Sequence, residues 1–184
     1  ATAETTAAHV REDHSDFIAR GSRLTTEVSQ LPLDATLEAL RVAHEHGLAT
    51  VVDLDVLPSD AIKGLGDQPT LNAVLREADL LKPTTLAARE LFPEIGSLPD
   101  LVSAIRNEYG ISTIVLTDGE NGSLLGDAAG NRWVAAYSIP KVVDSTGAGD
   151  AFFGGFLAGE ALGLDLEAAA KLGNACGAAC VEQM

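Results

Sequence analysis

Hydrophobic residues follow two alternating patterns along the chain: short continuous apolar runs, and longer segments with apolar residues at helical spacing. The short runs predict strands at residues 23–30, 49–55, 79–83 and 112–117. The helical spacing between them predicts helices at residues 34–46, 70–78, 84–92 and 99–109. Strands that alternate with helices are typical of a parallel sheet with both faces covered. We therefore expect an α/β fold with a doubly wound, mainly parallel sheet.

The two ends of this pattern differ from its centre. Residues 1–22 are polar with weak helical periodicity, so we treat them as a poorly defined N-terminal segment and residues 23–184 as the α/β domain. After residue 117, a Gly-containing turn and two further apolar runs around Leu124 and Trp133 predict a hairpin.

Small residues dominate the C-terminal helical region. Residues 166–181 are rich in Ala and Gly, which indicates close helix packing, and Gly155 and Gly159 are expected to serve the same purpose. Cys176 and Cys180 lie four positions apart, on one face of this helix. With no other Cys in the chain and no His nearby, we expect core residues rather than a zinc pair.

Composition narrows the class of protein. The chain has 184 residues, 46% hydrophobic and 21% charged, which is enough to bury one core. Its formal net charge of −15 argues against nucleic acid as a partner and means that any phosphate-bearing ligand must be captured by local donors. No apolar run approaches the roughly 20 residues of a membrane span, and the first residues do not follow the basic-then-apolar pattern of a signal segment. We expect a cytoplasmic protein that does not bind membranes.

Residues 144–150, Asp-Ser-Thr-Gly-Ala-Gly-Asp, carry the most informative chemistry. The backbone N–H groups at the start of a helix lack intrahelical partners and favour anions. Gly147, Ala148 and Gly149 leave that backbone open to a phosphate or a developing oxyanion. Asp150 stands beside them, where a carboxylate can accept a proton from an alcohol. This arrangement suits phosphoryl transfer to a hydroxyl.

This stretch, together with the following Ala-Phe-Phe-Gly-Gly-Phe, resembles the C-terminal signature of the ribokinase-like, or PfkB, carbohydrate kinases. The resemblance implies that Asp150 is the catalytic base and that residues 147–149 form the anion hole. It also implies ATP and Mg²⁺ as cofactors, and a K⁺ site at Asp144 and Thr146. The implied fold is the ribokinase type without its N-terminal part and lid.

Further positions match the same family. Thr117, Gly119 and Gly122 fit its Thr-x-Gly-x-x-Gly pattern, which contacts nucleotide phosphate and ribose, and Asn174 resembles an asparagine near the adenosine. We interpret Asn174 itself as an exposed helical residue. Asp53 and Asp55, at the end of a predicted strand, correspond to substrate contacts near the sugar and phosphates.

Two departures from the family pattern concern charge. Leu57 stands where arginine is frequent, and the Asn-x-x-Glu motif that organises magnesium is replaced by Thr84 and Ala87. Loss of that carboxylate predicts weakened or rerouted metal binding, because Mg²⁺ prefers hard oxygen ligands. Lys82 is a hypothetical substitute phosphate contact.

The function that the resemblance implies is ATP-dependent phosphorylation of a hydroxyl on a sugar or sugar-like substrate. The matched motifs belong to the C-terminal half of the family, so we expect a fragment of a longer protein that forms a homodimer through a lid absent here. Two alternatives stay open. One is a haloacid dehalogenase-like phosphatase using Asp53 and Asp55, and the other is a binding remnant for nucleotide or sugar without turnover.

Overall fold

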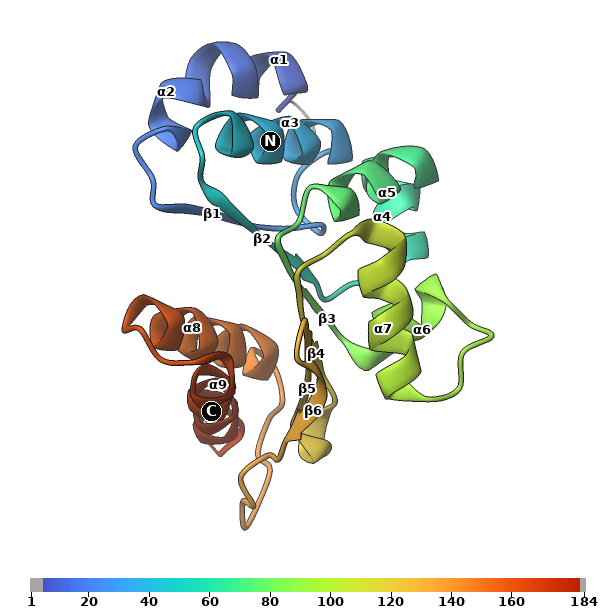
Figure 1. Ribbon diagram of the computed structural model, residues 1–184, viewed down its shortest axis with the longest axis vertical. Helices are drawn as coiled ribbons and strands as arrows, with labels where there is room; N and C mark the ends of the chain where they lie inside the picture. The colour runs from blue at the N-terminus through green and yellow to red at the C-terminus, as the bar shows by residue number, and fades with distance from the viewer. Residues whose placement is uncertain (1–4, 183–184) are drawn as a thin grey trace.

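A six-stranded sheet forms the centre of the molecule in the computed structural model, which describes residues 5–182. The strands follow one another in chain order across the sheet, with β1 to β4 parallel and β5 and β6 added as an antiparallel hairpin (Figure 1). Their bounds are β1 (Arg23–Glu27), β2 (Ala49–Leu54), β3 (Leu80–Pro83), β4 (Thr113–Thr117), β5 (Ser123–Asp127) and β6 (Gly130–Val134).

Helices cover both faces of the sheet, as the alternation of strands and helices predicts. One face carries α3 (Leu33–Glu45), α4 (Pro58–Leu65), α5 (Gln68–Arg76), α6 (Thr85–Leu91) and α7 (Leu98–Tyr109). The other carries α8 (Ala148–Ala161) and α9 (Leu166–Val181), drawn in orange and red in Figure 1, on the opposite side of the strands from α6 and α7. The fold is therefore the predicted doubly wound α/β arrangement.

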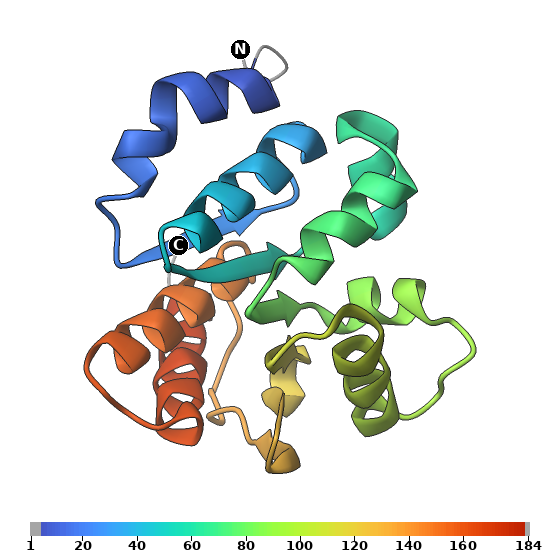
Figure 2. The same ribbon diagram turned by 45° about the horizontal axis from the view of Figure 1, so that its top comes forward.

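The N-terminal segment is helical where the structure describes it. It consists of α1 (Ala7–His9), a π-helical turn at Val10–His14 and α2 (Ser15–Ile18). These turns lie against α3 in Figure 2, with Val10 buried and Arg11 paired to Glu38 and Glu45 of α3. The segment thus extends the helical layer on the α3 face of the sheet.

Strand residues alternate between two cores. Val52, Leu54 and Leu81 belong to the core beneath α3 to α7, whereas Val51 and Leu80 belong to the core beneath α8 and α9. Side chains two positions apart on a strand share a face. Alternation therefore sends Asp53 and Lys82 to the α8 face, where the predicted anion-binding turn lies.

The contact between α8 and α9 depends on small residues, as predicted. A Cβ added at Gly155 would stand 2.6 Å from the Sγ of Cys176, and one at Gly159 would stand 2.9 Å from the Cα of Ala169. Both distances are shorter than any real Cβ contact, so the two helices reach this separation only with glycine at these positions.

The start of α5 differs from its predicted range because the prediction did not include an N-cap at Asp67. Helix α5 begins at Gln68, two residues before the expected start, because the Asp67 carboxylate accepts a hydrogen bond from the Thr70 N–H at 2.9 Å. Residues 58–65 form a full short helix. Within residues 5–182, no helix is both long and apolar enough to cross a membrane.

Candidate functional site

The turn at residues 144–150, predicted to bind an anion, is shaped by hydrogen bonds on both sides of Gly147. The Asp144 carboxylate accepts from the Thr146 N–H at 2.9 Å, and the Ala148 N–H donates to the Ser145 carbonyl at 3.1 Å. Hydrogen bonds from the backbone N–H and the side chain of Thr146 hold the pKa of Asp144 below its usual range. Gly147, the residue before α8, has φ of 78°, a backbone conformation that residues other than glycine rarely adopt.

Helix α8 then begins at Ala148, which places two backbone donors beside a carboxylate. As the second and third helical residues, Gly149 and Asp150 have N–H groups with no intrahelical acceptor. The Asp150 residue is exposed. The turn thus combines open backbone donors, the positive end of a helix dipole and an accessible carboxylate.

A buried ion pair lies directly beside this turn. Asp53 and Lys82 face each other in register on β2 and β3, and the Lys82 Nζ donates to both carboxylate oxygens at 2.9 Å. Lys82 is 1% exposed and Asp53 5%. The Nζ lies 3.4 Å from the position of a Cβ built on Gly149 and 5.5 Å from the ring centroid of Phe153.

Burial controls the protonation of Asp53. Desolvation raises its pKa to about 6, although the charge and hydrogen bonds of Lys82 oppose the rise. The negative charges of Asp55 and Asp150 raise this pKa further. The structure therefore brings Asp53, Asp55 and Asp150 into one electrostatic cluster at the carboxyl ends of the strands.

The loop after β4 contains the second predicted group, Thr117, Gly119 and Gly122. Gly119 has φ of 55° and Gly122 has φ of 97°, and a Cβ at Gly122 would stand 2.2 Å from the Val134 carbonyl oxygen. Glycine is required at position 122 both by the backbone conformation and by the approach of the neighbouring chain.

A carboxylate clamp holds this loop against the neighbouring strand end. The Thr85 hydroxyl donates to one Asp118 oxygen at 2.7 Å, and the Asn121 amide donates to the other at 2.9 Å. None of the sequence motifs predicts this clamp. A Thr at the start of α6 opposite an Asp after β4 was the available signal.

The two predicted groups open into one cavity of about 670 Å³. Its lining includes Thr117, Gly119, Gly122, Ala148, Gly149 and Asn174. A cavity of this size, bordered by glycine-rich backbone on two sides, suits a nucleotide. Asp53 and Asp150 do not line it, so within the described residues the cavity is distinct from the acidic cluster that it adjoins at Gly149.

The interpretation of Asn174 as an exposed helical residue was wrong. Asn174 is 7% exposed, and its side-chain amide donates to the Val134 carbonyl at 3.0 Å and to the Ala135 carbonyl at 3.1 Å. It therefore ties α9 to the chain that leaves β6. Its place in the cavity wall keeps it beside any ligand bound there.

The start of α6 shows how the altered metal motif is used. The Thr84 hydroxyl accepts from the Ala87 N–H at 3.1 Å and so serves as the N-cap of α6, and Ala87 is fully buried. Among residues 5–182 there is no group of three His, Cys, Asp or Glu side chains that could hold a metal ion. The residues present fit a Mg²⁺ that arrives with phosphate oxygens rather than one held by protein alone.

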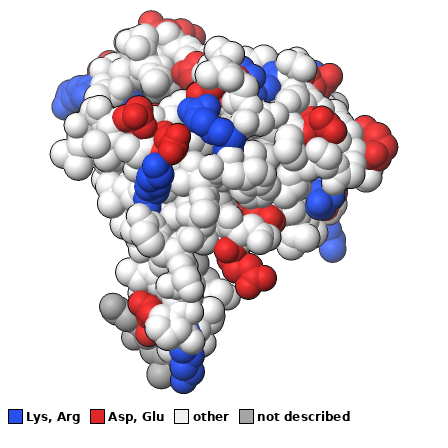
Figure 3. All heavy atoms as spheres, turned by 60° about the horizontal axis from the view of Figure 1, so that its bottom comes forward, with Lys and Arg blue, Asp and Glu red and all other residues white. Residues whose placement is uncertain are grey.

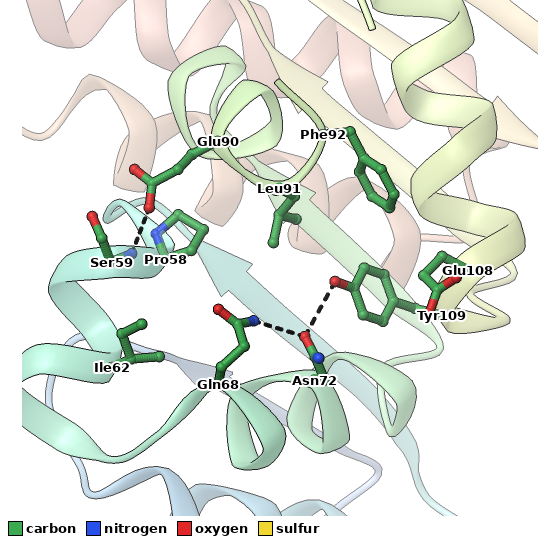
Figure 4. A pocket seen from close by; sticks show the side chains of 10 residues that line it. All are labelled: Pro58, Ser59, Ile62, Gln68, Asn72, Glu90, Leu91, Phe92, Glu108 and Tyr109. Atoms are coloured by element: carbon green, nitrogen blue, oxygen red, sulfur yellow. Dashed lines mark hydrogen bonds between the residues drawn. The ribbon is translucent and has the colours of Figure 1, made fainter. Parts of the chain in front are cut away.

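A second cavity of about 400 Å³ lies on the other face of the sheet, among α4, α5, α6 and α7 (Figure 4). Asn72 at its centre accepts from Gln68 and from the Tyr109 hydroxyl, and Glu90 accepts from the Ser59 N–H. None of the predicted site residues lines this cavity. Its polar groups instead join α5 to α7 and α4 to α6.

Charge on the surface gives no broad attraction for an anion. The face in Figure 3 carries basic and acidic side chains in small separate groups, without a continuous basic surface. Together with the net charge of −15, this face offers a phosphate-bearing ligand no broad electrostatic attraction.

Comparison with known proteins gives the family. The pfkB family carbohydrate kinase model matches residues 1–184. An uncharacterized sugar kinase of Archaeoglobus fulgidus is 32% identical over 163 residues, covering 87% of this chain and 60% of the relative. A 2-dehydro-3-deoxygalactonokinase of Haloferax volcanii is 29% identical over 94% of this chain and 53% of the relative. The chain thus spans little more than half the length of these relatives.

Solved structures agree on the fold. An adenosine kinase from Sinorhizobium meliloti is 26% identical with a TM-score of 0.82, covering 98% of this chain and 54% of that protein. A putative ribokinase II from E. coli in complex with ATP and Mg²⁺ is 24% identical with a TM-score of 0.84, covering 98% and 58%. From the match along its whole length, the chain belongs to the PfkB family of carbohydrate kinases.

Proposed function

We propose that the protein containing this chain transfers the terminal phosphoryl group of ATP to a hydroxyl of a sugar or sugar-like substrate. One observation carries the proposal: the open backbone donors at the start of α8 lie between an exposed carboxylate, Asp150, and a cavity bordered by the Thr117–Gly122 loop. Base, anion hole and nucleotide cavity thus adjoin one another.

Each part has a separate task in the reaction. Asp150 accepts the proton of the attacking hydroxyl, whose oxygen forms a bond to the terminal phosphorus while the bond to the bridging oxygen of ADP breaks. The N–H groups of Gly149 and Asp150 stabilise charge on the oxygens in transfer. The loop with Thr117, Gly119 and Gly122 holds the remaining phosphates and ribose, and Asn174 borders the adenosine side.

Cations complete the proposed site. A Mg²⁺ bound with the triphosphate supplies charge neutralisation at the phosphates. Asp55 is an exposed carboxylate of the cluster and would offer it an oxygen ligand, directly or through water. Asp144 and Thr146 are assigned to a K⁺ site that supports the anion-binding turn.

The phosphatase alternative is disfavoured by the state of Asp53. A phosphatase of that kind needs the first aspartate of its Asp-x-Asp motif as a free nucleophile. Here that position is Asp53, which is buried and engages both oxygens with Lys82. The same pairing leaves Asp55, rather than Asp53, as the acidic residue at this strand end that is open to a sugar.

A coupled assay of ADP release across a panel of acceptors tests the proposal. The panel should include pentoses, hexoses, 2-keto-3-deoxy sugar acids and nucleosides, since the relatives include kinases named for a 2-dehydro-3-deoxygalactonate and for cytidine. We expect acceptor-dependent ADP release that Asp150→Asn lowers by at least about a thousandfold. Asp60→Asn, an exposed acid on α4, is the matched control.

Two outcomes would contradict the proposal. Phosphate release from sugar phosphates that requires Asp53 would establish the phosphatase. Tight ATP binding without turnover on any acceptor would favour a binding remnant.

Sedimentation of the natural protein separately tests the homodimer that the family resemblance implies.

A further inference from the structure

The Lys82–Asp53 pair calls for an explanation beyond folding. Removing an ammonium and a carboxylate from water is costly, and a buried ion pair is often no more stable than apolar residues of similar volume. Both side chains are almost completely buried on a sheet face where their neighbours Val51 and Leu80 are aliphatic. Stability alone gives no reason for charge here.

The position of the ammonium relative to the anion-binding turn supplies a reason. The Lys82 Nζ lies 3.4 Å from a Cβ built on Gly149, the residue whose N–H is one of the open donors. Two of its three N–H groups are directed to Asp53. The positive charge of Lys82 is therefore fixed next to the backbone that would receive a phosphoryl group. This region contains little water, so electrostatic interactions there are strong.

The same strand end has lost the usual means of organising charge. Lys82 lies two residues before Thr84, and Thr84 and Ala87 carry no carboxylate for a metal ion. A cation that belongs to the protein itself would offset part of this loss. Asp53 holds that cation in place, which is why its own oxygens are fully engaged.

We propose that the Lys82–Asp53 pair favours binding of the terminal phosphoryl group of ATP at the anion-binding turn, with Lys82 as the source of the charge and Asp53 as its holder. Both are positioning residues that act through the field at the start of α8. The inference rests on the proposed kinase function and assigns to these two residues a preference for ATP over ADP.

Calorimetric titration with Mg-ATP and with Mg-ADP measures that preference without turnover. The test variant is the double replacement Lys82→Met with Asp53→Leu, which removes both charges but keeps apolar volume, so that no unpaired charge remains buried. Lys82→Gln with Asp53→Asn is a second neutral pair for use if the first does not fold. The control is Arg23→Met with Glu160→Gln, which removes the 2.8 Å ion pair between β1 and the far end of α8.

We expect the folded neutral variant to lose about tenfold or more in ATP affinity while its ADP affinity changes by less than about twofold. The control should leave both affinities unchanged. An unchanged ratio of ATP to ADP affinity in a folded neutral variant would overturn this inference while leaving the kinase proposal intact. If the natural protein binds neither nucleotide, the kinase proposal fails and this inference with it.

Discussion

Single glycines determine the shape of the nucleotide loop, and Gly122 can be tested against a matched position. Gly122→Ala combines a φ of 97° with a Cβ only 2.2 Å from the Val134 carbonyl oxygen. Gly130→Ala has a φ of 106° but meets nothing within 4 Å. We expect Gly130→Ala to cost about 1 kcal/mol of stability from backbone strain alone. Gly122→Ala should cost more and lower ATP affinity at least about tenfold, as denaturation and titration would measure.

The pKa of Asp53 predicts a pH dependence of stability with a definite sign. Its folded-state pKa of about 6 is above the unfolded value of 3.8, so between these values the folded chain binds more protons at this site. The contribution of Asp53 to stability is therefore fully present below pH 3.8 and lost as the pH rises through 6. Asp53→Asn should remove this component from denaturant midpoints measured between pH 4 and 7.

Asp127 provides a contrast for the same measurement. Its hydrogen bonds with Arg132 lower its pKa, so its contribution is present above the unfolded pKa and lost as the pH falls. Asp127→Asn should therefore shift the pH dependence in the opposite direction to Asp53→Asn. A common shift in both variants would contradict the structural assignment of these carboxylates.

At the scale of elements, the α8–α9 contact depends on where along α8 each glycine lies. Gly155→Ala brings a Cβ to 2.6 Å from the Sγ of Cys176, so we expect the helices to separate and the unfolding free energy to fall by about 1–3 kcal/mol. Gly154→Ala, which meets nothing within 4 Å, should stabilise α8 by up to about 1 kcal/mol. Cys176→Ala should partly rescue Gly155→Ala, as thermal denaturation of all four variants would show.

Most elements could be predicted because their signals are local. The strand–helix alternation was visible in sequence, and α3, α5, α6, α7 and α9 formed near their predicted ranges. What sequence reasoning missed depends on contacts between distant segments. Asn174 is buried only because the chain after β6 passes over α9. The Lys82–Asp53 pair depends on the register of β2 and β3, which only the folded sheet fixes.

At the scale of the whole molecule, the site lies where the parallel strands end and α8 begins. The doubly wound topology brings the ends of β2, β3 and β4 to one edge, where ligands of such sheets bind. The net charge of −15 supplies no attraction for a nucleotide there. We therefore expect nucleotide affinity to arise locally, from the glycine-shaped backbone and the buried Lys82 charge that are proposed to form the site. Since the chain spans about half the length of its relatives, sugar identity is to be tested on the natural protein.

The most direct test of the account measures ATP binding and phosphoryl transfer together in Asp150→Asn. Because Asp150 is proposed as the base and not as a nucleotide contact, the variant should bind ATP within about threefold of the natural protein and lose at least about a thousandfold in turnover. The site assignment would be contradicted by an Asp150→Asn variant that retains turnover with its best acceptor.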